Sequence, residues 1–397
     1  MNVLWILNGC GLEGGSVTGG PVRFHEVSRR WKAMGATQRL MTTSGGEAML
    51  RGLGCDLPVV RVPASVFLRK EPCRAFRLWS YVVSAVCAPC HIRAVFRGDG
   101  EAPDVAITAS DYFCDIVPAM CAKRAGSRWI AWIHHRELPP SQRPGNRLVN
   151  ALTHRMQEWS LRRIARHADS AWMYDTEAGD LVRERLLAYG MPESRIRRMR
   201  CGVNVEDIGR TPEPAEKSVD ATMIGVRPNK GLHDILPIWE RVLKRRPGTT
   251  LRLMGGMSGE AETLETIRAR GLDRIISVFR PEGGFLPAAD YYAKIRESKI
   301  LFAPSHEEGW GIAVCEAMAA GVPVAAYGLP VYRRIYGESF LRVPCFDFDA
   351  FADAIVELLD SQAAYADYRA RGLRCAETFG WGRIAEEDFR AAETPGL

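Results

Sequence analysis

The chain of 397 residues is 47% hydrophobic and 25% charged, and it carries a formal net charge of +6. This composition is typical of a soluble globular protein and excludes an intrinsically disordered chain. The length exceeds what one hydrophobic core usually supports, so we expect two domains.

Strand-like runs alternate with helical patterns from the N-terminus onward. The first run, 3–7, follows no basic stretch and is far shorter than the roughly 20 residues of a membrane span, so it predicts a buried strand. Further strands are predicted at 38–41, 105–108, 129–133 and 171–174, with helices at 21–34 and 147–165. Such alternation indicates a parallel sheet covered by helices.

A second series of strands begins after a charged linker, 208–218, which Pro212 and Pro214 interrupt. Its predicted strands are 222–226, 251–254, 276–279, 300–303 and 322–327. The pattern predicts an α/β protein with two doubly wound, Rossmann-like domains, 1–205 and 206–377, and a C-terminal helix in 378–397. Ligands of such sheets bind at the carboxyl ends of the strands.

Eleven cysteines are scattered without repeated metal-binding spacing, so we expect reduced thiols and a cytoplasmic location. The one CxxC pair, Cys87 and Cys90, has no second pair to complete a zinc site. A redox or metal role for it is the less favoured interpretation.

Glu308 and Glu316 lie on either side of a glycine-rich helix start. The turn Gly309, Trp310, Gly311 leaves backbone N–H groups open before a helix predicted from Ile312, and such an end attracts phosphate oxygens. Eight residues of helix rise roughly 12 Å, whereas carboxylates that jointly cleave a glycosidic bond lie roughly 5 to 9.5 Å apart. The two glutamates are therefore expected to bind a sugar hydroxyl and a ribose, with a diphosphate between them.

The run EGWGIAVCE followed by AMAAGVPV resembles the E-x7-E signature of GT-B glycosyltransferases, in particular the retaining GT4 group. The resemblance implies the GT-B fold, two Rossmann-like domains facing across a cleft, with the acceptor on the first domain and the nucleotide-sugar donor on the second. It also implies retention of anomeric configuration and independence from metal ions. The last segment, FGWGRIAEEDFRAAE, resembles the helix that crosses back to the first domain in this fold.

Gly9, Gly11 and Gly14 spell the dinucleotide fingerprint G-x-G-x-x-G after the first strand. The helix is expected only after a further Gly19-Gly20, and the second strand ends in Thr42-Thr43-Ser44 without an acid for a ribose, which disfavours NAD. In the GT4 group a loop ending in Gly-Gly faces the donor phosphates, and Gly19 and Gly20 match that place. The alternative is that these glycines only permit tight turns.

The segment IGVRPNKG, 224–231, resembles the basic loop that follows the first strand of the donor domain in that family. A guanidinium and an ammonium there would stabilise the charge of a leaving nucleoside diphosphate. Arg227 and Lys230 are the candidates. Val226 stands between the glycine and the arginine, and the gap to the lysine is short, which leaves the register of Arg227 open.

His134 and His135 follow the strand 129–133, and the resemblance implies that His134 contacts the transferred sugar, although His135 remains an alternative. A purely structural histidine is the other interpretation. No Asp-x-Asp pair is placed to hold a diphosphate-bound cation, so we expect no metal and no cofactor. Asp347 and Asp349 lead into a helix, where capping is expected.

The segment 66–97 carries six basic residues and one acid among aromatic residues, which suits contact with an anionic membrane as well as a solvated helix face. No nucleic-acid-binding module is visible. The resemblance to the GT4 group implies a hexosyltransferase (EC 2.4) that transfers a sugar from a nucleotide donor to a glycan or lipid-linked acceptor, in surface polysaccharide or glycolipid synthesis at the inner face of the membrane. A GT-B epimerase or hydrolase and a silent glycan-binding subunit are the alternatives. The donor base, the sugar, the acceptor and the oligomeric state stay open.

Overall fold

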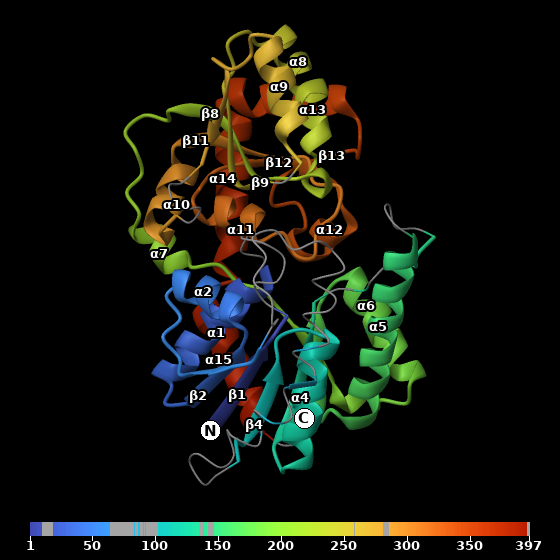
Figure 1. Cartoon of the computed structure of the whole chain (residues 1–397). Helices are drawn as coiled ribbons and strands as arrows, with labels where there is room; N and C mark the ends of the chain where they lie inside the picture. The colour runs from blue at the N-terminus through green and yellow to red at the C-terminus, as the bar shows by residue number, and fades with distance from the viewer. Residues whose placement is uncertain are drawn as a thin grey trace. The chain divides into compact units, whose positions relative to one another are not determined.

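The computed structural model describes residues 1–9, 19–63, 83, 86–87, 90, 92, 102–134, 136, 139–141, 147–257, 259–280 and 286–394. The chain divides into two compact units, Met1–Arg200 together with Gly382–Leu397, and Cys201–Trp381 (Figure 1). The divisions fall at 200/201 and 381/382, whereas the sequence placed them at 205/206 and 377/378. Two backbone hydrogen bonds account for the difference: Val203 N donates to Phe379 O at 2.8 Å, and Trp381 N donates to Val203 O at 3.2 Å. They join the segment around Val203 to the segment 379–381, so both segments belong to unit 2.

Unit 1 contains a seven-stranded parallel sheet in the order β3-β2-β1-β4-β5-β6-β7. Its strands are β1 (Asn2–Leu7), β2 (Thr37–Thr42), β3 (Val59–Arg61), β4 (Val105–Thr108), β5 (Arg128–Ile133), β6 (Ser170–Tyr174) and β7 (Ile196–Met199). Its helices are α1 (Gly19–Ala33), α2 (Ser44–Gly52), α4 (Phe113–Arg124), α5 (Arg147–His167), α6 (Glu177–Ala188) and α15 (Trp381–Glu393). The strand order reverses between β1 and β4, as in a doubly wound Rossmann sheet.

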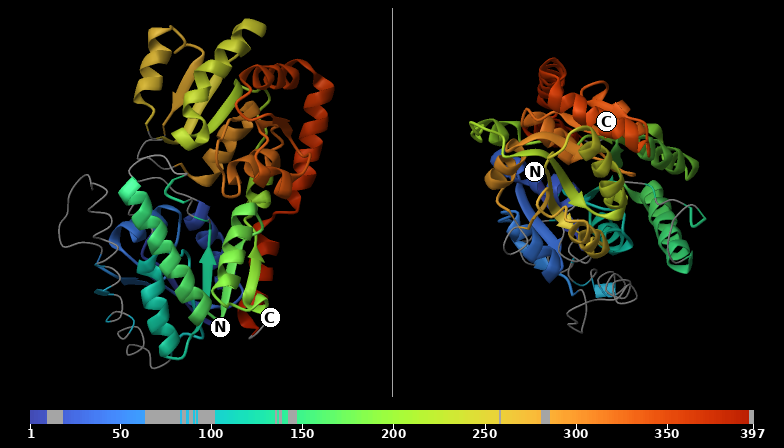
Figure 2. Two further views of the ribbon diagram at one scale, coloured as in Figure 1. Left: turned by 90° about the vertical axis from the view of Figure 1, so that its right-hand side faces the viewer. Right: turned by 90° about the horizontal axis from the view of Figure 1, so that it is seen from above.

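Helices cover both faces of this sheet (Figure 2), and the side chains of β1 pack on both sides. Leu4 and Ile6 pack into a core with residues of α4 and α5. Trp5 points to the other face, where its ring lies 5.2 Å from the rings of both Phe24 and Trp31 on α1. Alternate side chains of a strand point to opposite faces, so a run of five buried residues, Val3 to Leu7, requires helices on both sides.

Helix α15 belongs to the Trp5 face of unit 1. Trp31 Nε1 donates to Ala385 O at 2.9 Å, and Arg23 forms a buried ion pair with Asp388. The Arg23 guanidinium also lies over the Trp132 ring at 4.0 Å. Removing one partner of such a buried pair typically costs about 3 to 5 kcal/mol, so the C-terminal helix is firmly bound to this sheet.

Unit 2 contains a six-stranded parallel sheet in the order β10-β9-β8-β11-β12-β13. Its strands are β8 (Val219–Val226), β9 (Leu251–Met257), β10 (Ile276–Phe279), β11 (Ser298–Ala303), β12 (Val324–Tyr327) and β13 (Leu341–Val343). Its helices include α7 (Val205–Arg210), α8 (Ile235–Arg245), α9 (Ala261–Ala269), α10 (Ala288–Arg296), α11 (Ile312–Ala319), α12 (Pro330–Tyr336), α13 (Phe348–Asp360) and α14 (Gln362–Glu377). The order reverses between β8 and β11, so this sheet repeats the Rossmann arrangement.

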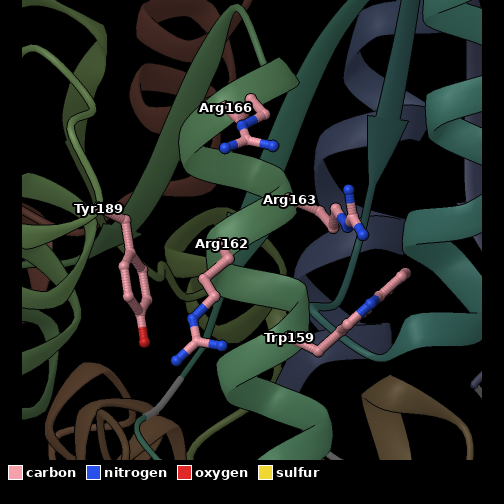
Figure 3. Close-up of a pocket in the computed structure, with 5 residues that line it drawn as sticks. All are labelled: Trp159, Arg162, Arg163, Arg166 and Tyr189. Atoms are coloured by element: carbon pink, nitrogen blue, oxygen red, sulfur yellow. The ribbon is translucent and has the colours of Figure 1, made fainter.

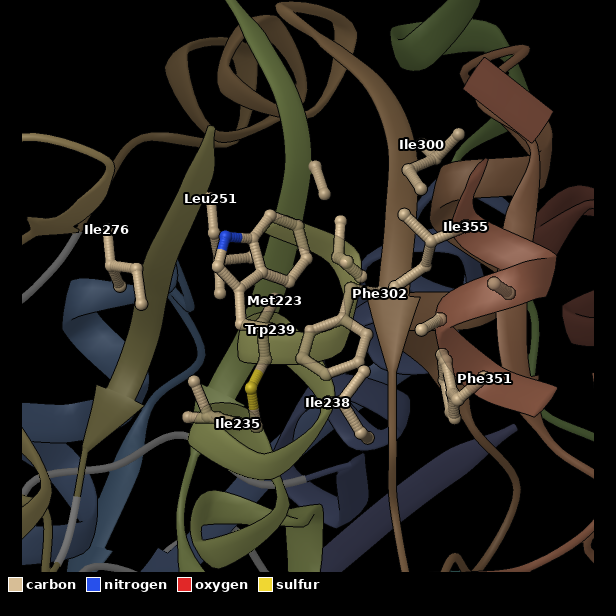
Figure 4. Packing of buried hydrophobic residues seen from close by; sticks show 14 of the residues in the cluster. Met223, Ile235, Ile238, Trp239, Leu251, Ile276, Ile300, Phe302, Phe351 and Ile355 are labelled. Carbon is tan, nitrogen blue, oxygen red and sulfur yellow. The ribbon is translucent and has the colours of Figure 1, made fainter. Parts of the chain in front are cut away.

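One face of the unit 2 sheet packs on α8 and α13 (Figure 4). The residues Ile235, Ile238, Trp239 and Val242 recur at helical spacing and form the buried face of α8. The Phe302 ring of β11 lies between Trp239 at 5.7 Å and Phe351 at 5.1 Å. Asp347 caps α13, because its carboxylate accepts from Ala350 N at 2.9 Å, and this confirms the predicted capping role.

The predicted elements agree with the structure, with shifts of one to three residues at their ends; β8, for example, begins at Val219 and not at 222, and β9 ends at Met257 and not at 254. Helix α1 begins at Gly19, two residues before the predicted start, so Gly19 and Gly20 form its first turn and not the loop before it. Pro21 is tolerated there because N–H groups of a first turn have no partner within the helix. Strand β12 begins at Val324 and not at 322.

Candidate functional site

In unit 2 the candidate residues lie in the two loops that leave β8 and β11, the adjacent strands at which the sheet order reverses. Arg227 directly follows β8, and Lys230 ends a short 3-10 helix, η2 (Pro228–Lys230). The loop after β11 leads to α11. In open α/β sheets ligands bind where loops from such neighbouring strands diverge.

Backbone contacts hold these two loops together. Asn229 O accepts from His306 N at 3.0 Å and from Glu307 N at 3.3 Å. Gly231 has a φ of 84°, and a Cβ on it would lie 2.1 Å from Pro304 O. Only glycine permits both this left-handed conformation and this close approach. The loops therefore form one rigid surface.

Lys230 and Glu308 form an ion pair across the two loops. The side chains are 17% and 10% exposed, so the pair is largely removed from water. Ser305 Oγ donates to Glu308 Oε1 at 2.9 Å. The sequence placed both charged residues at the donor, but it gave no sign that they pair with each other or that Ser305 completes the pair.

Arg227 contributes the second positive charge of this surface. Its Nε is buried and has no hydrogen-bond partner within the described part of the chain. A buried guanidinium nitrogen without a partner is unfavourable, and an anion that accepts a hydrogen bond from it would remove the penalty. This observation supports an anionic ligand beside Arg227.

The start of α11 is fixed by aromatic residues. Gly311 has a φ of 85°, and a Cβ on it would lie 2.5 Å from the Tyr332 ring. Tyr336 Oη donates to the carbonyl oxygens of Trp310 and Gly311, each at 3.1 Å. Among the described residues no side chain caps the helix, so its first N–H groups remain available to a ligand.

The predicted donor-binding residues at this turn differ in which of their atoms a ligand could contact. The Trp310 side chain is buried, and its ring lies 5.3 Å from Tyr336 and 5.1 Å from Phe379. It anchors the turn, so only its backbone can face a ligand. Gly309 and Ile312 lie on either side of the anchored turn.

Glu316 lies one turn into α11, and Tyr291 of α10 donates to its Oε2 at 2.8 Å. Burial raises the pKa of Tyr291 well above its usual value, and Glu316 raises it further, so the hydroxyl keeps its proton and acts as a donor. The sequence analysis did not identify Tyr291. An aromatic residue in a helical pattern carries no local sign that it orients a carboxylate on another helix.

In unit 1 the candidates His134 and Gly20 lie side by side. His134 follows β5, and a Cβ on Gly20 would be 3.2 Å from its Nε2. Nε2 lies 2.6 Å from Ala109 O, and Nδ1 lies 3.0 Å from Tyr174 Oη. A carbonyl oxygen only accepts, so Nε2 carries the proton and, in the neutral ring, Nδ1 accepts from the tyrosine. His135 is outside the described residues, as are Gly11 and Gly14.

Asp115 of α4 joins the loops after β1 and β4, where the order of the unit 1 sheet reverses. Its carboxylate accepts from Asn8 N at 2.6 Å and from Ser110 Oγ. Burial raises its pKa to about 7 despite the hydrogen bonds from Ser110 and the backbone. The sequence analysis missed this residue, which holds the backbone of Asn8 just after β1.

No group of three or more potential metal ligands occurs among the described residues. Neither Cys87 nor Cys90 forms a disulfide with another cysteine of the described residues. Most of the basic and aromatic segment 66–97 falls outside the described residues. No helix in the described part of the chain is long and apolar enough to cross a membrane.

The part of the chain that carries these residues matches a known protein family. Residues 220–361 match the model of the family "Glycosyl transferases group 1". This part of the chain is a glycosyl transferases group 1 domain. The domain includes Arg227, Lys230, Glu308 and Glu316, together with the turn that starts α11. The predicted resemblance to GT4-type enzymes is thereby confirmed.

Two glycosyltransferases resemble this chain over part of its length. A phosphatidyl-myo-inositol mannosyltransferase of Mycobacterium leprae is 31% identical over 201 residues, which cover 49% of this chain and 52% of that protein. A D-inositol 3-phosphate glycosyltransferase of Corynebacterium efficiens is 31% identical over 183 residues, covering 44% of this chain and 42% of that protein. The matches thus span about half the length of these relatives or less.

Solved structures extend the likeness of the fold to both units. Sucrose-phosphate synthase from Thermosynechococcus elongatus superposes with a TM-score of 0.74 at 15% identity, covering 98% of each chain. Anabaena HepE, solved with UDP-glucose, gives 0.71 at 13% identity, covering 98% of this chain and 99% of that one. The group 1 domain and its N-terminal unit therefore have the predicted GT-B fold, with two parallel-sheet Rossmann-like units.

Proposed function

We propose that this protein is a retaining glycosyltransferase that moves a sugar from a nucleotide-diphosphate sugar to a glycan or lipid-linked acceptor. The observation that carries the proposal is the cationic surface at the β8/β11 reversal, where the unpartnered Arg227 Nε and the Lys230–Glu308 pair precede the open start of α11. The relatives named above are glycosyltransferases, and HepE has been solved with UDP-glucose.

The proposed chemistry follows from the charges. The diphosphate of the donor accepts hydrogen bonds from the first N–H groups of α11 and from Arg227. As the bond between sugar and phosphate breaks, negative charge grows on the leaving group, and Arg227 and Lys230 stabilise it more in the transition state than before it. The lysine has three N–H donors, so it can serve the phosphate while remaining paired with Glu308.

The two glutamates bind hydroxyl groups in this proposal. Glu308 is oriented by Lys230 and Ser305 and accepts from hydroxyls of the transferred sugar. Glu316 is oriented by Tyr291 and accepts from the ribose of the nucleotide. From the family resemblance we also take His134 as a sugar-binding residue, and a sugar hydroxyl there would replace one of its present ring contacts. No metal ion or cofactor is needed, because the two cations neutralise the diphosphate.

The test has two steps. Thermal melting with UDP, GDP and ADP identifies the base, since a ligand that binds only the native state raises the melting temperature. The matching nucleotide sugar is then incubated with inositol phosphates, lipid-linked sugars and simple glycans, and transfer is measured by mass spectrometry. Transfer with retained anomeric configuration is expected. Donor cleavage without any acceptor would favour a hydrolase or epimerase, and binding without turnover a silent subunit.

A further inference from the structure

Helix α5 carries a continuous exposed stripe that the proposed reaction does not use. The stripe consists of Leu152, Arg155, Trp159, Arg162 and Arg166, which follow one another at intervals of three and four residues. Residues with this spacing share one face of a helix. Leu152 is 42% exposed and Trp159 36% exposed, although large apolar side chains are usually buried. We call this set the α5 stripe.

A pocket of about 300 Å³ opens beside the C-terminal half of the stripe. It is lined by Trp159, Arg162, Arg163, Arg166 and, from the end of α6, Tyr189 (Figure 3). The Arg162 guanidinium lies 5.1 Å from the centre of the Tyr189 ring, and that of Arg163 lies 5.3 Å from the Trp159 ring. The aromatic rings thus hold two of the three guanidinium groups in place.

Positive charge gathers at the C-terminal end of α5. Within the described residues Arg155, Arg162, Arg163 and Arg166 have no carboxylate partner. Glu158, the one acid of α5, is occupied by Arg136, Arg185 and Tyr189. Burial lowers the pKa of His167, and Arg163, Arg166 and Arg124 lower it further, which shows how closely the cations gather. A phosphate in the pocket would find several charged donors, while the neighbouring Glu158 already has partners.

This pocket is separate from the candidate site of unit 1. Helix α5 ends at His167 and β6 begins at Ser170, so its C-terminal half lies at the amino ends of the strands. Gly20 and His134 lie at the carboxyl ends. The pocket therefore cannot hold the reacting groups of the donor.

We propose that the α5 stripe is a docking surface for an anionic lipid bilayer, with a lipid phosphate held in the pocket. Apolar and cationic residues alternate along the stripe, so leucine and tryptophan can enter the headgroup region while the arginines meet phosphates. Tryptophan is favoured at this depth because its ring is apolar and its N–H is polar. A nucleic acid would use the arginines but would leave Leu152 without a partner.

The experiment measures binding of the purified full chain to vesicles by co-sedimentation. Vesicles of phosphatidylcholine alone are compared with vesicles in which one third of the lipid is phosphatidylglycerol. We expect binding only to the anionic vesicles, and loss of most of it in about 1 M sodium chloride, where the Debye length is about 3 Å. The double variant Arg162→Gln/Arg166→Gln should bind roughly 25-fold more weakly, about fivefold per arginine, which corresponds to about 1 kcal/mol for each basic residue.

Two further variants make the result specific. Leu152→Gln keeps the charge and should still weaken vesicle binding severalfold. Arg383→Gln/Arg390→Gln removes two exposed charges, paired with Glu387 and Glu386, from α15 of the same unit and should bind like the wild type. Melting temperatures check that each variant is folded.

Three outcomes would overturn the proposal: no binding of the wild type to anionic vesicles, equal binding by the stripe and α15 variants, or a stripe variant that loses binding to duplex DNA but not to vesicles. Nucleotide binding is measured in parallel and should not change in any variant. If the wild type binds no nucleotide, the glycosyltransferase proposal fails, but the membrane proposal does not, since vesicle binding involves no nucleotide.

Discussion

Gly20 lies against the imidazole of His134, so closely that a Cβ on the glycine would be 3.2 Å from the histidine Nε2. The two residues are far apart in the sequence: Gly20 is predicted to face the donor phosphates and His134 to contact the transferred sugar. Their contact brings the start of α1 and the end of β5 together at the carboxyl edge of the unit 1 sheet.

Gly20→Val should displace the His134 ring and lower kcat/KM for the donor by tenfold or more, with a smaller effect on melting temperature. The control is Gly52→Val at the end of α2, where an added Cβ meets nothing within 4 Å. In a His134→Ala background the Gly20→Val change should cost much less, because the clash is gone. Equal effects of Gly20→Val in both backgrounds would show that the contact does not matter.

Lys230→Ala should lower kcat by about a hundredfold while KM for the donor changes less, because the lysine acts mainly on the leaving group. It also leaves Glu308 with one fewer partner, so Lys230→Ala/Glu308→Gln should recover stability but not activity. Lys244→Ala, an exposed lysine of α8, is the control. Steady-state kinetics and melting curves separate the two effects, and an unchanged kcat would contradict the role.

Activity should persist in EDTA, because Arg227 and Lys230 provide the positive charge beside the diphosphate in the proposed mechanism. The measurement compares initial rates of the dialysed enzyme with EDTA and with added manganese or magnesium. An enzyme that EDTA inactivates and manganese restores would assign the neutralising role to a metal ion.

Glu316→Ala should weaken binding of the nucleoside diphosphate by about 1 to 3 kcal/mol, the range for a hydrogen bond to a charged group. Tyr291→Phe should weaken it by about 1 kcal/mol, since the carboxylate loses the donor that orients it. Tyr368→Phe on α14 is the matched control. Calorimetric titration measures all three. A Tyr291→Phe protein with wild-type affinity would remove Tyr291 from the site.

Asp115 should make the stability of unit 1 depend on pH. Burial raises its pKa from 3.8 to about 7, so between these values the native state binds more protons than the unfolded chain. Its contribution to stability therefore falls as pH rises from about 4 to about 7, by at most about 1.4 kcal/mol per pH unit, and is constant above.

Asp115→Asn removes this dependence, so the difference in unfolding free energy between wild type and variant should shrink or change sign toward neutral pH. Urea unfolding at pH 5, 6 and 8 measures it, with Glu184→Gln at an exposed carboxylate as the control. Parallel pH profiles of wild type and Asp115→Asn would refute the assignment.

Much of this protein follows from its sequence because the signals are local. Continuous apolar runs such as Val3 to Leu7 predict strands buried on both faces, and the spacing of Glu308, Gly311 and Glu316 places a helix start between two carboxylates. Asp347 likewise shows its capping role within four residues. Each of these patterns depends on backbone geometry alone, which repeats wherever the same residues occur.

Other features were decided only when distant segments met. The short edge strands β3, β7 and β13 exist because a neighbouring strand pairs with them, as β2 does with β3, and their three or four residues carry little signal of their own. The Lys230–Glu308 pair, the Tyr291 donor and the buried Asp115 each join elements from separate parts of the chain. Their charges and hydrogen bonds matter because tertiary packing removes them from water, and burial is a property that no single segment of sequence possesses.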